Sequence, residues 1–60
     1  MNVKALRIKR KLNQTDLAKR AGVTQAYIAM LERGRNVNPT LGLLTKLAKV
    51  LKVTVAELVG

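Results

Sequence analysis

Hydrophobic residues recur along this chain every three or four positions, and short polar or glycine-containing segments separate the apolar runs. This spacing is typical of amphipathic helices, whereas a half-buried strand alternates apolar and polar residues. The Asn-Gly and Asp-Gly dipeptides that mark tight hairpins do not occur. The pattern therefore predicts one compact all-α domain of five short helices over residues 1–60. Their expected ranges are about 2–11, 14–21, 25–33, 41–51 and 55–59.

Each of the last four expected helices follows a residue whose side-chain oxygen can accept a hydrogen bond from a backbone amide three positions later. In the last helix, Thr54 and Glu57 also form the T-x-x-E pattern of a capping box. Gly22 and Gly34 mark the ends of the second and third helices, because glycine adopts the left-handed conformation without a Cβ clash. The four expected N-caps are Asn13, Thr24, Thr40 and Thr54.

The apolar stripes of these helices predict an aliphatic core, since Tyr27 is the one aromatic residue. The helix-to-helix connection of 35–39 is expected to be a loop, because Pro39 disfavours a helical Asn38. The positions expected to face the core are Val3, Ala5, Leu6, Leu17, Ala18, Ala21, Ile28, Leu31, Leu41, Leu44, Leu47, Ala48 and Leu51.

The side-chain chemistry argues against an enzyme. The chain has no cysteine and no histidine, so it lacks the usual thiolate, metal ligand and general base. Asp16, Glu32 and Glu57 are its three carboxylates. Two of them are expected in helix caps and the third in an ion pair. We therefore expect no catalysis, no metal, no cofactor and no small-molecule substrate.

The charge balance points to a polyanionic partner. Twelve Lys and Arg residues against three acids give a net charge of +9. Such a field attracts nucleic acid or an anionic membrane surface. No apolar run approaches the length of a membrane span, and the basic segment Met1 to Leu12 has no long apolar stretch of a signal peptide. These observations favour nucleic acid over a membrane as the partner, and a cytosolic protein.

Three segments carry a recognisable pattern: Asn-Gln-Thr-Asp-Leu-Ala at 13–18, Ala-Gly-Val-Thr-Gln at 21–25, and Leu-Glu-Arg-Gly at 31–34. With Ile28, Pro39 and the leucines of 41–51, they resemble the phage-repressor-like helix-turn-helix family, the Cro- and Xre-type DNA-binding domains. The resemblance covers nearly the whole chain. It implies that the partner is double-stranded DNA, in a prokaryotic cytosol or a phage-infected host. It also implies that the third helix enters the major groove, that the second crosses the backbone, and that operator binding usually involves a two-fold dimer.

Gln14 and Gln25 match positions that are glutamine in several phage repressors. There, one glutamine holds the other flat against a base, and an amide can bond bidentately to adenine. The alternative is that both are solvated residues at helix starts. The resemblance implies base contacts from Gln25, Ala26, Tyr27 and Met30. It implies contacts to the DNA backbone, or positioning, from Gln14, Asn13, Thr24, Arg33, Arg35, Asn36, Asn38 and Thr40.

Arg7 and Glu32 match a family pair, which predicts a bidentate and partly buried ion pair between the first and third helices. Lys11 and Lys52 depart from the family, which often has glycine there. A non-glycine residue in the left-handed region costs about 1–2 kcal/mol. We therefore expect distorted or strained helix ends at these two lysines.

The function predicted is sequence-specific DNA binding by a repressor-like transcriptional regulator. Two alternatives remain. One is a coactivator or protein-interaction module with the same fold, which would show no preference for one duplex over a scrambled one. The other is a cationic membrane-active peptide, whose helices would be unfolded in water. Circular dichroism in plain buffer separates this last class.

Overall fold

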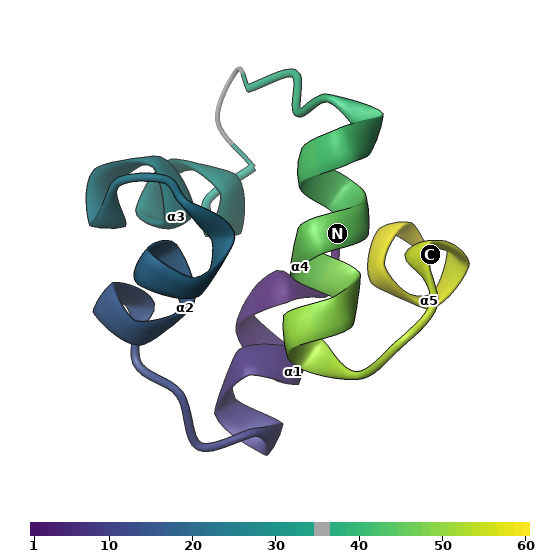
Figure 1. Ribbon diagram of the computed structural model, residues 1–60, viewed down its shortest axis with the longest axis horizontal. Helices are drawn as coiled ribbons and strands as arrows, with labels where there is room; N and C mark the ends of the chain where they lie inside the picture. Colours follow the sequence, from purple (N-terminus) through teal and green to yellow (C-terminus); the bar gives the residue numbers. More distant parts are fainter. Residues whose placement is uncertain (35–36) are drawn as a thin grey trace.

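In the computed structural model, the described part of the chain forms five helices. Figure 1 shows how they are arranged. The structure describes residues 1–34 and 37–60. The helices are α1 (Val3–Lys9), α2 (Gln14–Ala21), α3 (Gln25–Glu32), α4 (Leu41–Leu51) and α5 (Val55–Val59). The described residues contain no strand, and the all-α prediction is confirmed.

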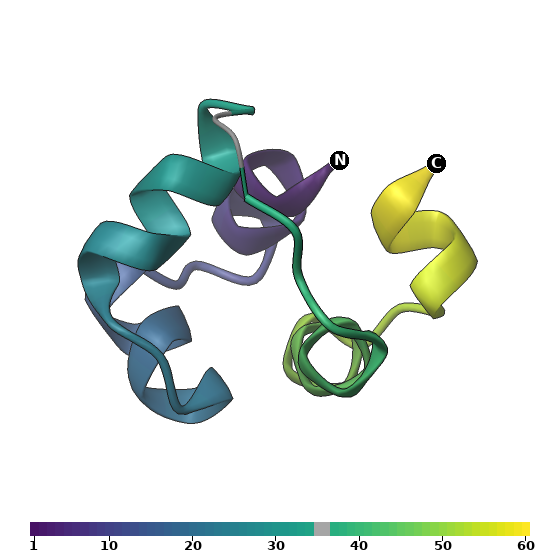
Figure 2. The ribbon, with the colours of Figure 1, turned by 90° about the horizontal axis from the view of Figure 1, so that it is seen from above.

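The helices pack around one small aliphatic core. α2 contacts both α3 and α4, α4 contacts α5, and α1 contacts α3. Viewed along α4, the pair α2–α3 lies on one side and α5 on the other (Figure 2). Asn2 joins the two ends of the chain, because its backbone amide donates to the carbonyl of Leu58 over 2.9 Å. Its side-chain amide donates to the carbonyl of Glu57 over 3.0 Å.

All four expected N-caps are present. Asn13 Oδ1 accepts from the amide of Asp16 over 2.7 Å, and the Asp16 carboxylate accepts in return from the amide of Asn13. This second bond completes a capping box that the sequence analysis did not predict. The predicted capping box of Thr54 and Glu57 is confirmed. The two remaining caps, Thr24 and Thr40, accept from the amides of Tyr27 and Leu43 over 3.1 Å each.

Two residues expected in the core are exposed. Ala5 lies about 200° around α1 from the buried Val3, because successive helical residues are about 100° apart. Leu41 is 70% exposed, because it opens α4 in a turn that extends beyond α5 (Figure 1). Leu6 and Leu44 are half-buried against the core. The fully enclosed residues are Val3, Leu17, Ala18, Ala21, Ile28, Leu31, Leu47, Ala48, Leu51 and Leu58.

The helix ends explain the remaining differences from the sequence-based ranges. α1 ends at Lys9 instead of residue 11, since Lys11 has φ 57° and a left-handed residue cannot continue a right-handed helix. Lys52 has φ 58° at the end of α4, so both lysines adopt the strained conformation that we expected. α3 ends at Glu32, with Arg33 as its C-cap. Arg10 Nε donates to the carbonyl of Leu51 over 3.0 Å and so links α1 to the end of α4.

Candidate nucleic-acid interface

Helices α2 and α3 form a tight unit that presents one face of α3 to solvent. Between them, Gly22 adopts φ 74°, and the amide of Val23 donates back to Ala18 over 2.9 Å. Ile28 and Leu31 bury the inner face of α3. On the outer side, Tyr27 and Ala29 are half-buried, and Tyr27 packs against the core. The exposed residues of α3 are Gln25, Ala26 and Met30.

An ion pair connects the end of this unit to α1. Arg7 Nε donates to Glu32 Oε2 over 2.7 Å, and Arg7 Nη2 donates to Oε1 over 3.1 Å. The two side chains are 11% and 4% exposed, so the pair is nearly buried. Arg7 Nη1 also donates to the carbonyl of Leu12 over 2.9 Å. The structure therefore contains the bidentate pair that the resemblance implied.

The two glutamines extend this junction to the start of α3. Gln14 Nε2 donates to Glu32 Oε1 over 3.0 Å, and Gln25 Nε2 donates to Gln14 Oε1 over 2.7 Å. We call Glu32, Gln14 and Gln25 the amide chain. The contact between the two glutamines was expected from the resemblance. The bond from Gln14 to Glu32 was missed, because only the packing of α2 on α3 brings these residues together.

Glu32 stays ionised within this junction. Burial is the largest influence on the pKa of its carboxyl group, and burial alone would raise that pKa. Hydrogen bonds from Arg7 and Gln14, with the charges of Arg7 and Lys4, outweigh burial and hold the pKa below its ordinary value. The hydrogen bond to Glu32 in turn raises the pKa of Arg7. Glu32 is therefore a permanent hydrogen-bond acceptor at neutral pH.

The expected backbone-contacting residues occupy helix starts and the segment after α3. Asn13, Thr24 and Thr40 are exposed at the N-termini of α2, α3 and α4. Their side-chain oxygens accept from helix amides, which leaves the Asn13 amide and the threonine hydroxyl protons available as donors. Arg33 and Asn38 are also exposed. The expected contacts of Arg35 and Asn36 lie outside the described residues.

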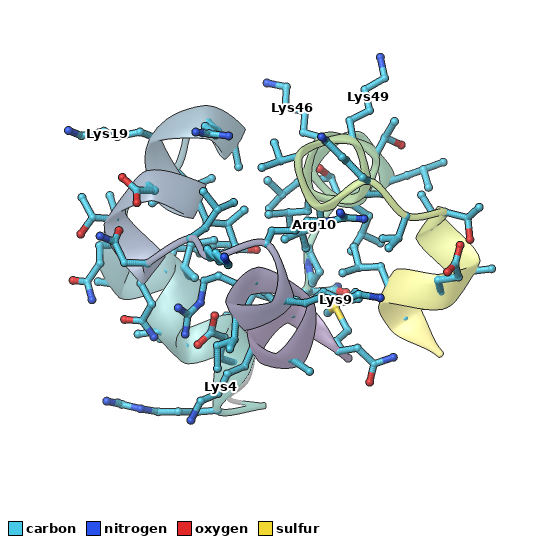
Figure 3. The ribbon with its side chains drawn as sticks, turned by 90° about the horizontal axis from the view of Figure 1, so that it is seen from below. Lys4, Lys9, Arg10, Lys19, Lys46 and Lys49 are labelled. Atoms are coloured by element: carbon cyan, nitrogen blue, oxygen red, sulfur yellow. The ribbon has the colours of Figure 1, made fainter. Side chains whose placement is uncertain are left out.

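Exposed cations surround the rest of the molecule. Lys19 projects from α2, and Lys46 and Lys49 project from α4 (Figure 3). Lys4 and Lys9 both come from α1: in the same view Lys4 lies at the edge opposite Lys46 and Lys49, and Lys9 lies near the centre. Asp16 and Glu57 are engaged in caps, and within residues 1–34 and 37–60 neither forms an ion pair with these groups. We call the following set the outer cations: Lys4, Lys9, Lys19, Arg33, Lys46, Lys49 and Lys52.

The described residues offer little for other chemistries. Residues 1–34 and 37–60 hold no group of three or more side chains that could coordinate a metal ion. None of the helices in this part of the chain is both long enough and apolar enough to cross a membrane.

This fold is a helix-turn-helix domain. The capped helix α2 is followed by a turn at Gly22 and by α3, whose first residue, Gln25, carries an exposed side-chain amide. A family model described as helix-turn-helix matches residues 3–58. The chain belongs to this helix-turn-helix family.

The relatives of this chain include a repressor and transcriptional regulators. An immunity repressor protein of Bacillus phage phi105 is 41% identical over 58 residues, which cover 97% of this chain and 40% of that protein. An uncharacterized HTH-type transcriptional regulator of Sinorhizobium fredii is 43% identical over 58 residues, covering 97% of this chain and 74% of that protein. The phage-repressor-like resemblance is confirmed. This chain spans less than half the length of the phage repressor.

A solved structure has a fold similar to that of this chain along nearly the whole length of both chains. The crystal structure of SinR, the master regulator for biofilm formation, in complex with DNA matches with a TM-score of 0.88 and 33% identity. The match covers 97% of this chain and 92% of the SinR chain. The five-helix fold predicted from the sequence is therefore that of a helix-turn-helix domain solved with DNA.

Proposed function

We propose that this domain binds double-stranded DNA sequence-specifically and serves as the DNA-binding part of a transcriptional repressor, with α3 in the major groove. The observation that carries the proposal is the exposed Gln25 amide at the start of α3, fixed by Gln14 over 2.7 Å. A fixed amide on an exposed helix is what base-edge recognition requires. Its membership of the helix-turn-helix family and the likeness to SinR solved with DNA support the same function.

The outer residues of α3 recognise the bases. Gln25 bonds to adenine through N6 and N7, which is the standard pairing of a side-chain amide in the major groove. Ala26 contacts a thymine methyl group, and the exposed Met30 supplies a further apolar contact. Tyr27 is half-buried, so its ring supports α3 while its hydroxyl end reaches a phosphate or sugar.

Phosphate contacts position the domain. The N-terminus of α2 presents unpaired backbone amides beside Asn13 and Gln14, and helix N-termini favour anions. The second N–H of the Gln14 amide is available to a phosphate oxygen. Thr24, Arg33, Asn38 and Thr40, with Arg35 and Asn36 from the sequence, complete this set. The +9 charge adds binding that does not depend on sequence.

Repression follows from occupancy of the operator and needs no chemistry from the protein. Two copies on half-sites about one helical turn apart would match the two-fold arrangement common for this type of domain. The domain would exclude other proteins from the DNA that it covers.

Selection from random duplexes tests the proposal. We expect enrichment of one sequence, bound at least tenfold more tightly than its scrambled version at fixed salt. Equal affinity for the selected and scrambled duplexes would contradict the proposal and favour the protein-interaction alternative. A circular dichroism spectrum without a helical signal in plain buffer would instead favour the membrane-active peptide.

A further inference from the structure

The amide chain has a direction that its first member imposes. A carboxylate has acceptor oxygens only, whereas a side-chain amide has one acceptor and two donor hydrogens. Glu32 therefore requires Gln14 to turn its NH₂ group inward, and the observed bond is Gln14 Nε2 to Glu32 Oε1 over 3.0 Å. Gln14 must then present its carbonyl oxygen to Gln25. Gln25 is obliged to donate, which it does over 2.7 Å.

This direction determines what Gln25 offers to DNA. One of its two N–H groups is used on Gln14, so one N–H and the carbonyl oxygen remain on the outer side. An adjacent donor and acceptor match N7 and N6 of adenine. Guanine presents two acceptors, N7 and O6, in the same places. The Gln25 carbonyl would then face an acceptor without an intervening hydrogen.

We infer that Glu32 is a positioning residue for base selection, which orients the Gln25 amide through Gln14 so that α3 prefers adenine over guanine. This inference rests on the proposed function. Glu32 does not touch DNA. It is suited to the task because its side chain is 4% exposed and Arg7 holds both of its oxygens, so the carboxylate cannot rotate away from Gln14.

Glu32→Gln tests the direction with little change in shape. The new amide can meet Gln14 with either its oxygen or its NH₂ group, so it no longer imposes one direction on the chain. When it donates to Gln14, Gln25 accepts, and the NH₂ group of Gln25 faces the groove, where it matches the two acceptors of guanine. We expect the ratio of adenine to guanine affinity to fall at least tenfold. The duplexes are the selected site and its A·T to G·C change at the position where Gln25→Ala loses discrimination.

Asp16→Asn is the matched control, since it removes one negative charge at the same end of α2 but lies outside the amide chain. A merely structural or electrostatic role of Glu32 would change the affinity for both duplexes alike, as this control does. Gln14→Met is the second variant, because it breaks the amide chain and leaves the ion pair of Arg7 and Glu32 intact. If Glu32→Gln does not fold, Gln14→Met still tests the inference. Its ratio of adenine to guanine affinity should also fall.

A measurement on the free protein separates this inference from the proposed function. The scalar coupling across the hydrogen bond from Gln25 Nε2 to the Gln14 carbonyl should be present in the wild type and weaker in Glu32→Gln. If the wild type binds neither duplex, the proposed function fails, and this coupling still decides the direction of the chain. A wild-type base ratio in both Glu32→Gln and Gln14→Met would overturn the inference, as would a coupling unchanged by Glu32→Gln.

Discussion

The junction at the start of α3 and the outer cations use polar groups in opposite ways. In the junction, Arg7, Glu32, Gln14 and Gln25 are joined by hydrogen bonds of 2.7 to 3.1 Å. The outer cations are exposed in solvent, and among the described residues none of them forms an ion pair with a carboxylate. The first arrangement fixes the orientation of the Gln25 amide and is suited to discrimination between bases. The second supplies a long-range field and is suited to affinity.

The two regions should also respond differently to their surroundings. At physiological ionic strength, salt largely screens the interactions of exposed charges that lie more than about 8 Å apart, whereas a buried pair is screened much less. The junction should therefore govern stability and base preference, and the outer cations should govern salt dependence. The following experiments test this division, from the largest expected effect to the smallest.

Glu32→Ala should lower the free energy of unfolding by about 3–5 kcal/mol, because it leaves the Arg7 charge nearly buried without a partner. Asp16→Ala and Glu57→Ala remove only cap contributions, about 0.5–2 kcal/mol each. In a domain of this size the first change alone could unfold the protein. Urea melts of the three variants measure the difference. Equal midpoints would mean that the junction does not brace the fold.

Replacing both members of the ion pair tests whether the loss in Glu32→Ala comes from the unpaired Arg7 charge. Arg7→Met with Glu32→Leu should recover much of the stability lost in Glu32→Ala, since apolar packing can replace a buried pair. The double variant should still lose base preference, because the amide chain has no acceptor at its inner end. A double variant that melts no higher than Glu32→Ala would contradict this expectation.

Gln25→Ala should cost about 1–3 kcal/mol on the selected duplex and little on random DNA. Arg33→Ala should weaken both duplexes alike. Affinities measured from low to high salt should give a log–log slope of about −4 to −5 for the wild type, from about 4–6 neutralised phosphates. Arg33→Ala should reduce that slope by about 0.9, and Gln25→Ala should leave it unchanged. Equal losses from Gln25→Ala on both duplexes would exclude base reading.

Lys52→Gly should raise the free energy of unfolding by about 1 kcal/mol, because Lys52 adopts φ 58° and glycine accepts this conformation without strain. Gly22→Ala is the control at φ 74°, where nothing lies within 4 Å of an added Cβ and only the backbone conformation opposes alanine. It should destabilise by a similar amount. Lys52 is also an outer cation, so Lys52→Gly removes one positive charge together with the strain. Destabilisation by Lys52→Gly would show that the lysine is not strained.

The smallest effect should come from protonation of Glu32. Its pKa is lowered in the folded state, so its contribution to stability is fully present above the ordinary value of 4.5 and is lost as the pH falls through the lower folded value. Burial opposes the hydrogen bonds that lower the pKa, so the net contribution is modest. Thermal melts between pH 7 and pH 3 should show this loss, and Glu32→Gln should flatten that part of the curve. An identical curve in the variant would contradict it.

Local features of the fold were predictable from the sequence, because the groups involved lie within a few residues of one another. The caps at Asn13, Thr24, Thr40 and Thr54 are examples. Leu41 was placed wrongly, because helical periodicity identifies a face but not how far the core extends along it. The end of α1 was placed at residue 11 and not at Lys9: the resemblance marked Lys11 as a strained helix end, but no local signal showed that the helix stops two residues earlier.

The contacts of the candidate site also include some that could be predicted from the sequence and some that could not. The ion pair and the glutamine contact were expected because the resemblance carries the positions of their partners. The bond between Gln14 and Glu32 crosses 18 residues and depends on how α2 packs on α3. The bond from Arg10 to Leu51 crosses 41 residues and had no signal in the sequence. The DNA-contacting roles of the exposed residues stay predictions.

The hydrogen bonds of Asn2 have a consequence for the order of events during folding. They close a span of 55 residues to Glu57, whereas the contact between Gln14 and Gln25 closes 11. Loop-closure entropy makes the longer closure about 1.4 kcal/mol more costly. We therefore expect α2 and α3 to find each other early and the two ends of the chain to meet last. In the native state that meeting point should open first, so the amide of Asn2 should exchange with solvent sooner than those of α2.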